Sequence, residues 1–235
     1  MTAMKTIGLL GGLSWESTTL YYQHLNRGTR ERLGGLHSAP LVLWSFDFAE
    51  IEALMAAGDW TGATERIADA GKRLADAGAE LIVICSNTIH RMAGAVEAAA
   101  GVPLVHIADA TAQAVRAEGV MSPLLLATKF TMEGAFYRGH MQDHYGLSVR
   151  IPGDEARVEV HRIIFEELCQ GIIRPESKAA MLEIVDRAME EGADSVILGC
   201  TEVAMLIGQD DIGAPVFDST AIHANAVLDK ALTAD

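Results

Sequence analysis

Short apolar runs alternate with helical patterns along most of the chain. The runs predict strands at residues 6–11, 39–46, 80–85, 102–107, 123–128, 195–200 and 214–219. Between them, stretches such as 64–78 and 177–192 carry apolar residues at helical spacing and end in glycine, a common helix stop. Strands separated by helices favour βαβ units, so the sequence predicts an α/β protein with mainly parallel sheets.

One pattern occurs twice. When residues 75–88 are placed over 189–202, Gly78 meets Gly192, Cys85 meets Gly199 and Ser86 meets Cys200. A weaker echo pairs the strand at 6–11 with the strand at 123–128. We therefore expect two pseudo-symmetric lobes, residues 1–106 plus 216–235 and residues 107–215.

The repeat also predicts where a ligand binds. Ligands of open α/β sheets lie beyond the carboxyl ends of the strands. The turns at 86–88 and 200–202 follow such ends, so the site is expected in a cleft between the lobes. Side chains alternate along a strand, so Ser86 shares the orientation of Cys200 and Cys85 points elsewhere.

The composition of the chain argues against several classes of binding partner. Half of the 235 residues are hydrophobic and the formal net charge is −14. This charge argues against a nucleic-acid groove, which needs basic residues, and against an anionic membrane surface. No apolar run reaches the roughly 20 residues that span a bilayer. Three widely spaced cysteines suit neither a disulfide framework nor a metal site, and we expect a cytoplasmic protein without a metal.

The two cysteines of the repeat invite different interpretations. Cys85 lies within an apolar run, and a small buried hydrophobe is the common role for such a thiol. Cys200 ends a strand between Gly199 and Thr201, where backbone N–H groups could stabilise a thiolate. The alternative for Cys200 is another inert core thiol, and spacing alone does not decide between the two.

Several motifs, taken in order, resemble one family along almost the whole chain. They are "GLLGGLSWEST", "GGLHSA", "CSNT", "HIADAT", "FYRG", "IIFEEL", "GCTE" and "PVFDS". Together they resemble the cofactor-independent aspartate/glutamate racemases, in particular the bacterial branch acting on L-aspartate, L-glutamate or a wider range of amino acids. The resemblance implies two pseudo-symmetric lobes, an amino-acid substrate, no cofactor and frequent homodimers. It also implies one thiol from each lobe beside the α-carbon.

The chain departs from the family at one of the two thiols. Members usually carry Cys-Asn-Thr in the first lobe and Gly-Cys-Thr in the second. Here the second motif is intact, but the first reads Ser86-Asn87-Thr88. A thiol becomes a useful base when its surroundings favour thiolate, whereas a serine hydroxyl ionises only with help. Cys200 is therefore expected to abstract the α-proton, and Ser86 to donate or relay one.

The resemblance also suggests residues that bind the substrate, all of them polar side chains in turns after strands. These are Ser14, Asn87, Thr88, Thr128, Thr131, Thr201 and Glu202. Each has a plainer explanation, namely helix capping, turn chemistry or an acidic residue facing a helix dipole. Cys169 stands about where aspartate-specific members have a lysine, which argues against strict aspartate specificity. His140 and His144 have zinc-compatible spacing but no third ligand, so a solvated helix face is the better interpretation.

The sequence thus predicts a cofactor-independent amino-acid racemase for aspartate, glutamate or broader substrates. Two alternatives remain open. One is a single-thiol enzyme of the same fold, such as a decarboxylase that protonates an enolate from one face. The other is an amino-acid-binding protein that has lost one catalytic thiol. The intact "GCTE" argues against complete loss, and the polar turns argue against an apolar decarboxylase pocket.

Overall fold

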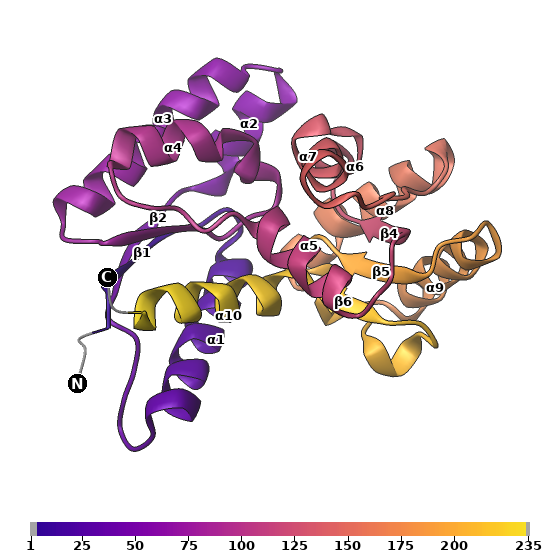
Figure 1. Cartoon of the computed structure of the whole chain (residues 1–235). Coiled ribbons are helices and arrows are strands. Elements are labelled where there is room, and N and C mark those ends of the chain that lie inside the picture. Colours follow the sequence, from indigo (N-terminus) through magenta and orange to yellow (C-terminus); the bar gives the residue numbers. More distant parts are fainter. Residues whose placement is uncertain (1–3, 234–235) are drawn as a thin grey trace. The chain divides into compact units, whose positions relative to one another are not determined.

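The computed structural model describes residues 4–233, which divide into two compact units. The first unit runs up to His106 and resumes at His223, and the second comprises Ile107–Ile222 (Figure 1). The boundary expected at residue 216 differs from this division by several residues. Strand β6 (Val216–Asp218) pairs with β5 (Ser195–Leu198), and this pairing places residues 216–218 in the second sheet.

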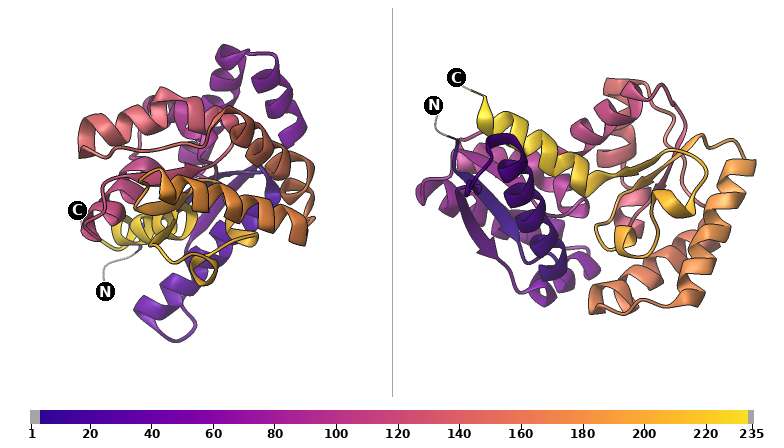
Figure 2. Two further views of the ribbon diagram at one scale, coloured as in Figure 1. Left: turned by 90° about the vertical axis from the view of Figure 1, so that its right-hand side faces the viewer. Right: turned by 90° about the horizontal axis from the view of Figure 1, so that it is seen from below.

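The first unit has a three-stranded parallel sheet in the order β2-β1-β3. Its elements are β1 (Ile7–Gly11), α1 (Trp15–Leu33), β2 (Leu41–Ser45), α2 (Phe48–Ala56), α3 (Trp60–Asp76), β3 (Leu81–Ile84), the 3₁₀ helix η1 (Thr88–Met92) and α4 (Ala93–Ala100). Most of helix α10 (Ser219–Leu232) also belongs to this unit. In both views of Figure 2 and in Figure 1, α10 runs beside α1, and Gly28 of α1 allows this because a Cβ there would meet Leu228 Cδ1 at 2.5 Å.

The second unit has a parallel sheet in the order β4-β5-β6. Its other elements are α5 (Ile107–Ala117), β4 (Pro123–Leu126), α6 (Lys129–Glu133), α7 (Ala135–Tyr145), α8 (Asp154–Glu166), η2 (Leu168–Gln170), α9 (Pro175–Glu190), η3 (Val203–Met205) and η4 (Gln209–Asp211). The strand residues of β4 and β5 are all buried. They form the centre of one continuous apolar core, as expected for a parallel sheet covered by helices.

Matching hydrogen bonds confirm that the two units repeat one architecture. The amide of Cys85 donates to the Leu10 carbonyl (3.0 Å), as the amide of Gly199 donates to the Leu126 carbonyl (2.8 Å). At the other end of these strands, the Glu80 carboxylate accepts from the Thr6 amide. The Asp194 carboxylate accepts likewise from the Ser122 amide. The alignment made from sequence therefore has the correct register in space.

The two glycines of the repeat behave alike as well. Gly78 and Gly192 follow α3 and α9 with φ values of +96° and +97°, a conformation that glycine adopts without steric cost. Each amide donates to a carbonyl three residues earlier, Ala75 and Met189 respectively. These turns join α3 to β3 and α9 to β5. Because the turns are alike, the two strands enter their sheets in the same way, and the residues after each strand take matching positions.

One predicted strand is wrong. Residues 102–107 form only a single bridge, between Leu104 and Ile82, with Val105 and the backbone of Pro103 hydrogen-bonded to β3. In the second unit the corresponding position beside β5 is taken by strand β6, and a separate single bridge joins Arg150 to Leu124 of β4. Among the described residues, no helix is both long and apolar enough to cross a membrane.

Candidate active site

Cys200 lies at the carboxyl end of β5, after Gly199. A Cβ at Gly199 would meet Leu125 Cδ1 at 2.5 Å and Ala127 Cβ at 3.1 Å, so a larger residue there would require the Leu125 side chain to shift. Cys200 is buried, with 8% of its surface exposed, at the margin of the second core. Its Sγ donates to Glu202 Oε2 at 2.9 Å. A core thiol does not require a buried carboxylate as its partner, so this contact favours a functional role for Cys200.

The electrostatics of Cys200 differ from the sequence expectation. Burial and the adjacent Glu202 carboxylate raise the pKa of the thiol well above its usual value. The expected stabilisation of a thiolate by backbone amides is therefore not the dominant effect. In this state Cys200 holds its proton, with an acceptor for that proton already in hydrogen-bonding contact.

Ser86 occupies the matching turn of the first unit, two residues after the end of β3, and is partly exposed. Its neighbour Cys85 is completely buried in the first core, and burial raises the pKa of its thiol strongly. The prediction that Cys85 is a buried hydrophobe is confirmed. Between these two neighbours, only Ser86 has any access to a ligand.

Four of the predicted substrate-binding residues lie in the segments after β3 and β5, namely Asn87, Thr88, Thr201 and Glu202. Asn87 precedes η1 and Glu202 precedes η3, but neither side chain caps the 3₁₀ helix that follows it. Asn87, Thr88 and Thr201 are buried polar residues immediately after the strand ends. Thr201 exchanges a hydrogen bond with Thr220 at 3.1 Å between hydroxyl oxygens. Capping thus does not account for Asn87 or Glu202.

The other three predicted contacts do have the plainer role. Ser14 caps α1 by accepting from the Ser17 amide at 3.3 Å. Thr128 caps α6 by accepting from the Thr131 amide, and the hydroxyls of Thr128 and Thr131 lie 3.2 Å apart. All three are buried. Helix capping and turn chemistry therefore explain these residues, whether or not they also contact a ligand.

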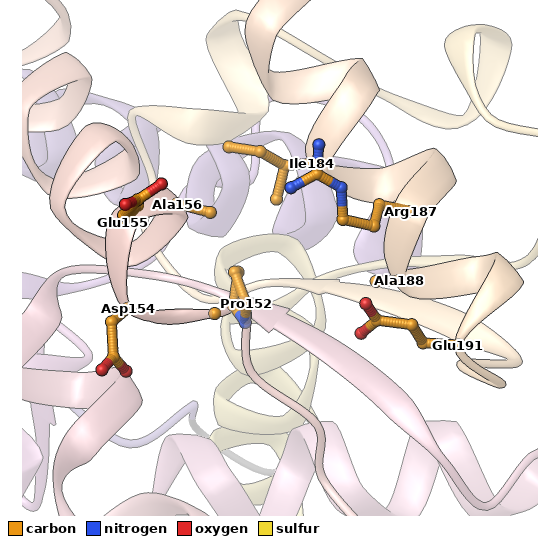
Figure 3. A pocket seen from close by; sticks show the side chains of 9 residues that line it. Pro152, Asp154, Glu155, Ala156, Ile184, Arg187, Ala188 and Glu191 are labelled. Carbon is orange, nitrogen blue, oxygen red and sulfur yellow. The ribbon is translucent and has the colours of Figure 1, made fainter.

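The residues that the sequence analysis rated as weak candidates, His140, His144 and Cys169, do not lie in the segments that follow β3 and β5. His140 and His144 both lie on α7, and His140 is hydrogen-bonded to Asp109. Cys169 lies in η2 and packs against the second core, close enough to contribute to the raised pKa of Cys200. A separate pocket of ≈ 370 Å³ opens at the start of α8, and Figure 3 shows Arg187 and Glu191 of the α9 region beside it. None of the predicted site residues lines that pocket.

Sequence reasoning missed a cluster of histidines in the first unit. His90 stacks edge-on against His106 and His223, with ring centroids 4.9 and 5.3 Å away. The hydroxyl of Tyr21 lies 2.8 Å from His223 Nδ1, and His223 Nε2 lies 2.8 Å from the Val105 carbonyl. The only sequence signal was the position of His90 one turn after Ser86. His106 and His223 are distant in sequence, so their contact depends on the fold.

The burial of His223 predicts sensitivity to acid. Burial lowers the pKa of His223 to about 4, against an ordinary value of 6.5. Between these values the unfolded chain binds a proton that the folded protein excludes, so stability is lost as pH falls through this window. We expect His223 alone to lower the free energy of unfolding by about 3 kcal/mol between pH 7 and pH 4.

Urea unfolding at both pH values checks this prediction. The control is His223→Gln, whose amide can still donate to Val105 but does not titrate in this range. It should lose about 3 kcal/mol less on acidification than the wild type. Equal losses in the two proteins would contradict the assignment.

Comparisons with a protein-family model and with three solved structures all point to racemases. Residues 10–227 match the model of a family described as Asp/Glu/hydantoin racemase. A crystal structure of an Asp/Glu racemase candidate from Yersinia pestis is 48% identical, with 98% of this chain and 100% of that chain covered and a TM-score of 0.91. An aspartate racemase homologue from Pyrococcus horikoshii OT3 is 37% identical over 98% and 100% of the two chains, with a TM-score of 0.85. Picrophilus torridus aspartate racemase shares the fold, at 21% identity, 97% and 94% coverage and a TM-score of 0.77.

Proposed function

Because the chain belongs to the Asp/Glu/hydantoin racemase family and is an amino-acid racemase, we propose that Cys200 and Ser86 carry its two proton transfers. Each residue follows the corresponding strand of one unit, and the matching hydrogen bonds of Cys85 and Gly199 support their equivalence. In this proposal the two residues act on opposite faces of one α-carbon. The single observation that carries it is the contact between the Cys200 thiol and the Glu202 carboxylate.

Cys200 is the base for the L-enantiomer. The α-proton of an amino acid is a very weak acid, so its removal needs a strong base that is shielded from water. The Cys200 thiol first passes its proton to Glu202, and the resulting thiolate takes the α-proton. Burial, which raises the pKa of the thiol, also makes the thiolate a stronger base once it has formed.

Ser86 supplies the proton on the other face. Its hydroxyl donates a proton to the carbanion and then regains a proton from solvent. Glu202 releases to solvent the proton that it took from Cys200, so the enzyme returns to its starting state. A hydroxyl is a poor base in the reverse direction, so abstraction from the D-enantiomer should be slower than from the L-enantiomer. The overall equilibrium is unaffected, because enantiomers have equal free energy, and the difference must be balanced between kcat and KM.

Neutral side chains would bind the α-carboxylate. Asn87, Thr88 and Thr201 offer amide and hydroxyl donors beside the two catalytic positions, and all three are buried. Glu202 would accept a hydrogen bond from the substrate ammonium group, whose positive charge would offset one of the effects that raise the Cys200 pKa. Ser14, Thr128 and Thr131 are weaker contacts in this scheme because they already cap or form turns.

The side chain of the substrate is the least constrained part of the proposal. Aspartate and glutamate agree with the family, and a wider range agrees with a cysteine, rather than a lysine, at position 169. We propose acidic amino acids as the preferred substrates. Rates with aspartate, glutamate, alanine and serine test this, and equal rates for all four would show that the side chain is not recognised.

Hydrogen exchange in deuterated buffer tests the function itself. Racemisation replaces the α-hydrogen of the substrate by deuterium and inverts its configuration. A decarboxylase acting on a substituted malonate would instead release carbon dioxide, and a binding protein would do neither. The reaction should proceed without added cofactor and survive a metal chelator. Light scattering checks the accompanying proposal of a homodimer, and fractionation of cells checks that of a cytoplasmic enzyme.

Replacing Glu202 tests its role toward Cys200. Glu202→Gln removes the proton acceptor while keeping the shape, and we expect exchange from the L-enantiomer to fall by about 10²-fold, in the range of single acid–base groups. The same change removes a negative charge that raises the thiol pKa, so the thiolate should form at lower pH. The pH dependence of alkylation by iodoacetamide measures this shift.

The two readouts of Glu202→Gln should therefore move in opposite directions, with easier ionisation but slower catalysis. Glu191 is exposed on the surface after α9, and Glu191→Gln is the matched control. A Glu202→Gln enzyme with wild-type exchange would remove Glu202 from the mechanism. An unchanged alkylation profile would show that the carboxylate does not act on the thiol.

A further inference from the structure

We propose that His90 is a positioning residue for Ser86, holding the backbone of the catalytic turn through its Nδ1–H group. This inference deepens the proposed function and rests on it, because it assumes that Ser86 takes part in proton transfer. It assigns a role to the histidine cluster that the rest of the mechanism does not use.

The contact is direct. His90 Nδ1 lies 2.7 Å from the carbonyl oxygen of Ser86, four residues earlier. His90 is itself in η1 and is 2% exposed, so the interaction does not compete with water. A carbonyl oxygen only accepts hydrogen bonds, so Nδ1 must carry the hydrogen. The Ser86 carbonyl is thus fixed by a side chain that belongs to the structured segment following it.

The surroundings of His90 favour the neutral ring with its hydrogen on Nδ1. Burial, together with the nearby His106 and His223, lowers the pKa of His90 well below its usual value. The ring is therefore neutral near pH 7 and has one hydrogen. Because that hydrogen is on Nδ1, Nε2 has none.

The ring is also held in place. It packs edge-on against His106 and His223. His223 is in turn fixed at both nitrogens, by the Tyr21 hydroxyl and the Val105 carbonyl. Because the Val105 carbonyl requires a hydrogen on His223 Nε2, the Tyr21 hydroxyl must donate to Nδ1. This chain of contacts fixes where the Nδ1–H of His90 points.

The second unit has a different arrangement at the same place. The repeat puts Ala204 opposite His90, and there the carbonyl of Cys200 accepts from the Val203 amide at 3.1 Å. The turn that carries the thiol is thus closed by the backbone, and the turn that carries the hydroxyl is held by a side chain. A hydroxyl is a weak acid, so its contribution depends strongly on its orientation.

Variants of His90 separate positioning from general stability. His90→Phe keeps a ring but removes the donor, and His90→Asn keeps a donor near the place of Nδ1. We expect His90→Phe to slow inversion by about 10-fold or more, since small displacements of catalytic groups can cost up to about 10²-fold. Exchange from the L-enantiomer through Cys200 should change by less than about 3-fold, the scale of a modest positional effect. His90→Asn should recover most of the inversion.

A double-mutant cycle asks whether His90 acts through Ser86. In a Ser86→Ala background the hydroxyl is gone, so adding His90→Phe should slow inversion by less than about 2-fold, because coupled residues are non-additive. An equal further loss in that background would overturn the proposal. So would a parallel loss of inversion and exchange in His90→Phe with no rescue by His90→Asn.

A spectroscopic measurement tests the contact without any assay of activity. In protein with ¹⁵N-labelled histidine, His90 should show a neutral ring with the hydrogen on Nδ1 at pH 7, and the ¹³C shift of the Ser86 carbonyl should change in His90→Phe. A hydrogen on Nε2 would overturn the proposal even if the enzyme proves active. If wild-type enzyme exchanges no amino acid, the proposed function fails, while the tautomer still decides whether His90 holds Ser86.

Discussion

Replacing Cys200 by alanine is expected to abolish exchange of the α-hydrogen from the L-enantiomer of the substrate, and inversion in both directions. Cys200 lies in the turn after β5, and its thiol donates to a buried carboxylate at 2.9 Å. No other side chain of the proposed site can form a comparable base, because hydroxyls ionise only with assistance. The loss should reach at least about 10⁴-fold, the upper range for one acid–base group, since the same residue serves both directions.

The matched control is Cys85→Ala. Cys85 is a completely buried thiol in the first core, so its replacement leaves a small cavity without touching the proposed site. We expect it to lower the free energy of unfolding by about 1 kcal/mol, the scale of one buried methylene-sized group, and to keep most of the activity. Exchange at the wild-type rate in Cys200→Ala would refute the mechanism. Complete loss in Cys85→Ala, with the fold intact, would point to the wrong thiol.

Exchange and inversion must be measured separately in these variants. Cys200→Ala should lose exchange from the L-enantiomer, because without the thiolate its α-proton is never removed. It should also lose inversion in both directions, because the carbanion formed from D is never protonated on the other face. Only the slow same-face exchange of D through Ser86 can remain. Circular dichroism and urea unfolding distinguish this from a failure to fold. The side chain lies at the margin of the second core, so the stability cost should resemble that of Cys85→Ala.

The features that could be read from the sequence are those set by local patterns. The strand cores around Leu9, Val83 and Ile197 are continuous apolar runs bounded by glycine, and the repeat placed Ser86 and Cys200 in matching positions. The paired hydrogen bonds of the two units follow from the same register. Residues 102–107 looked equally strand-like, but only Leu104 bridges to the sheet. Edge pairing depends on neighbours that a short apolar run does not specify.

The chemistry of the site was less predictable because it depends on burial. The turn after β5 suggested amides that would stabilise a thiolate, whereas burial and Glu202 raise the pKa of Cys200 instead. The role of His90 required knowing that His106 and His223 meet it in space. Ser14, Thr128 and Thr131 were expected to bind substrate; the structure shows that Ser14 and Thr128 cap helices and that Thr131 takes part in a turn, and their contact with a substrate stays a prediction. Residue types alone do not separate these roles.

Restoring a cysteine at position 86 should make the enzyme more symmetric. In Ser86→Cys, the turns after both strands would carry a thiol. We expect exchange from the D-enantiomer to rise by more than exchange from the L-enantiomer, because the reference pKa of a thiol is about 8.5 and a hydroxyl is a far weaker acid. A positioned acid or base of suitable pKa raises the reaction rate by about 10²- to 10⁴-fold. The rate of exchange from the D-enantiomer should therefore rise by at least about 10-fold.

Removing the hydroxyl should have the opposite effect. Ser86→Ala leaves Cys200 and Glu202 in place, so L-substrate can still be deprotonated and reprotonated on the same face, which gives exchange without inversion. Inversion should fall by at least about 10²-fold in both directions, as for loss of one acid–base group. The measurement is α-hydrogen exchange in deuterated buffer, followed from each pure enantiomer, with chiral chromatography of the product. Full inversion in Ser86→Ala would mean that Ser86 is only a turn residue and that bound water supplies the second proton.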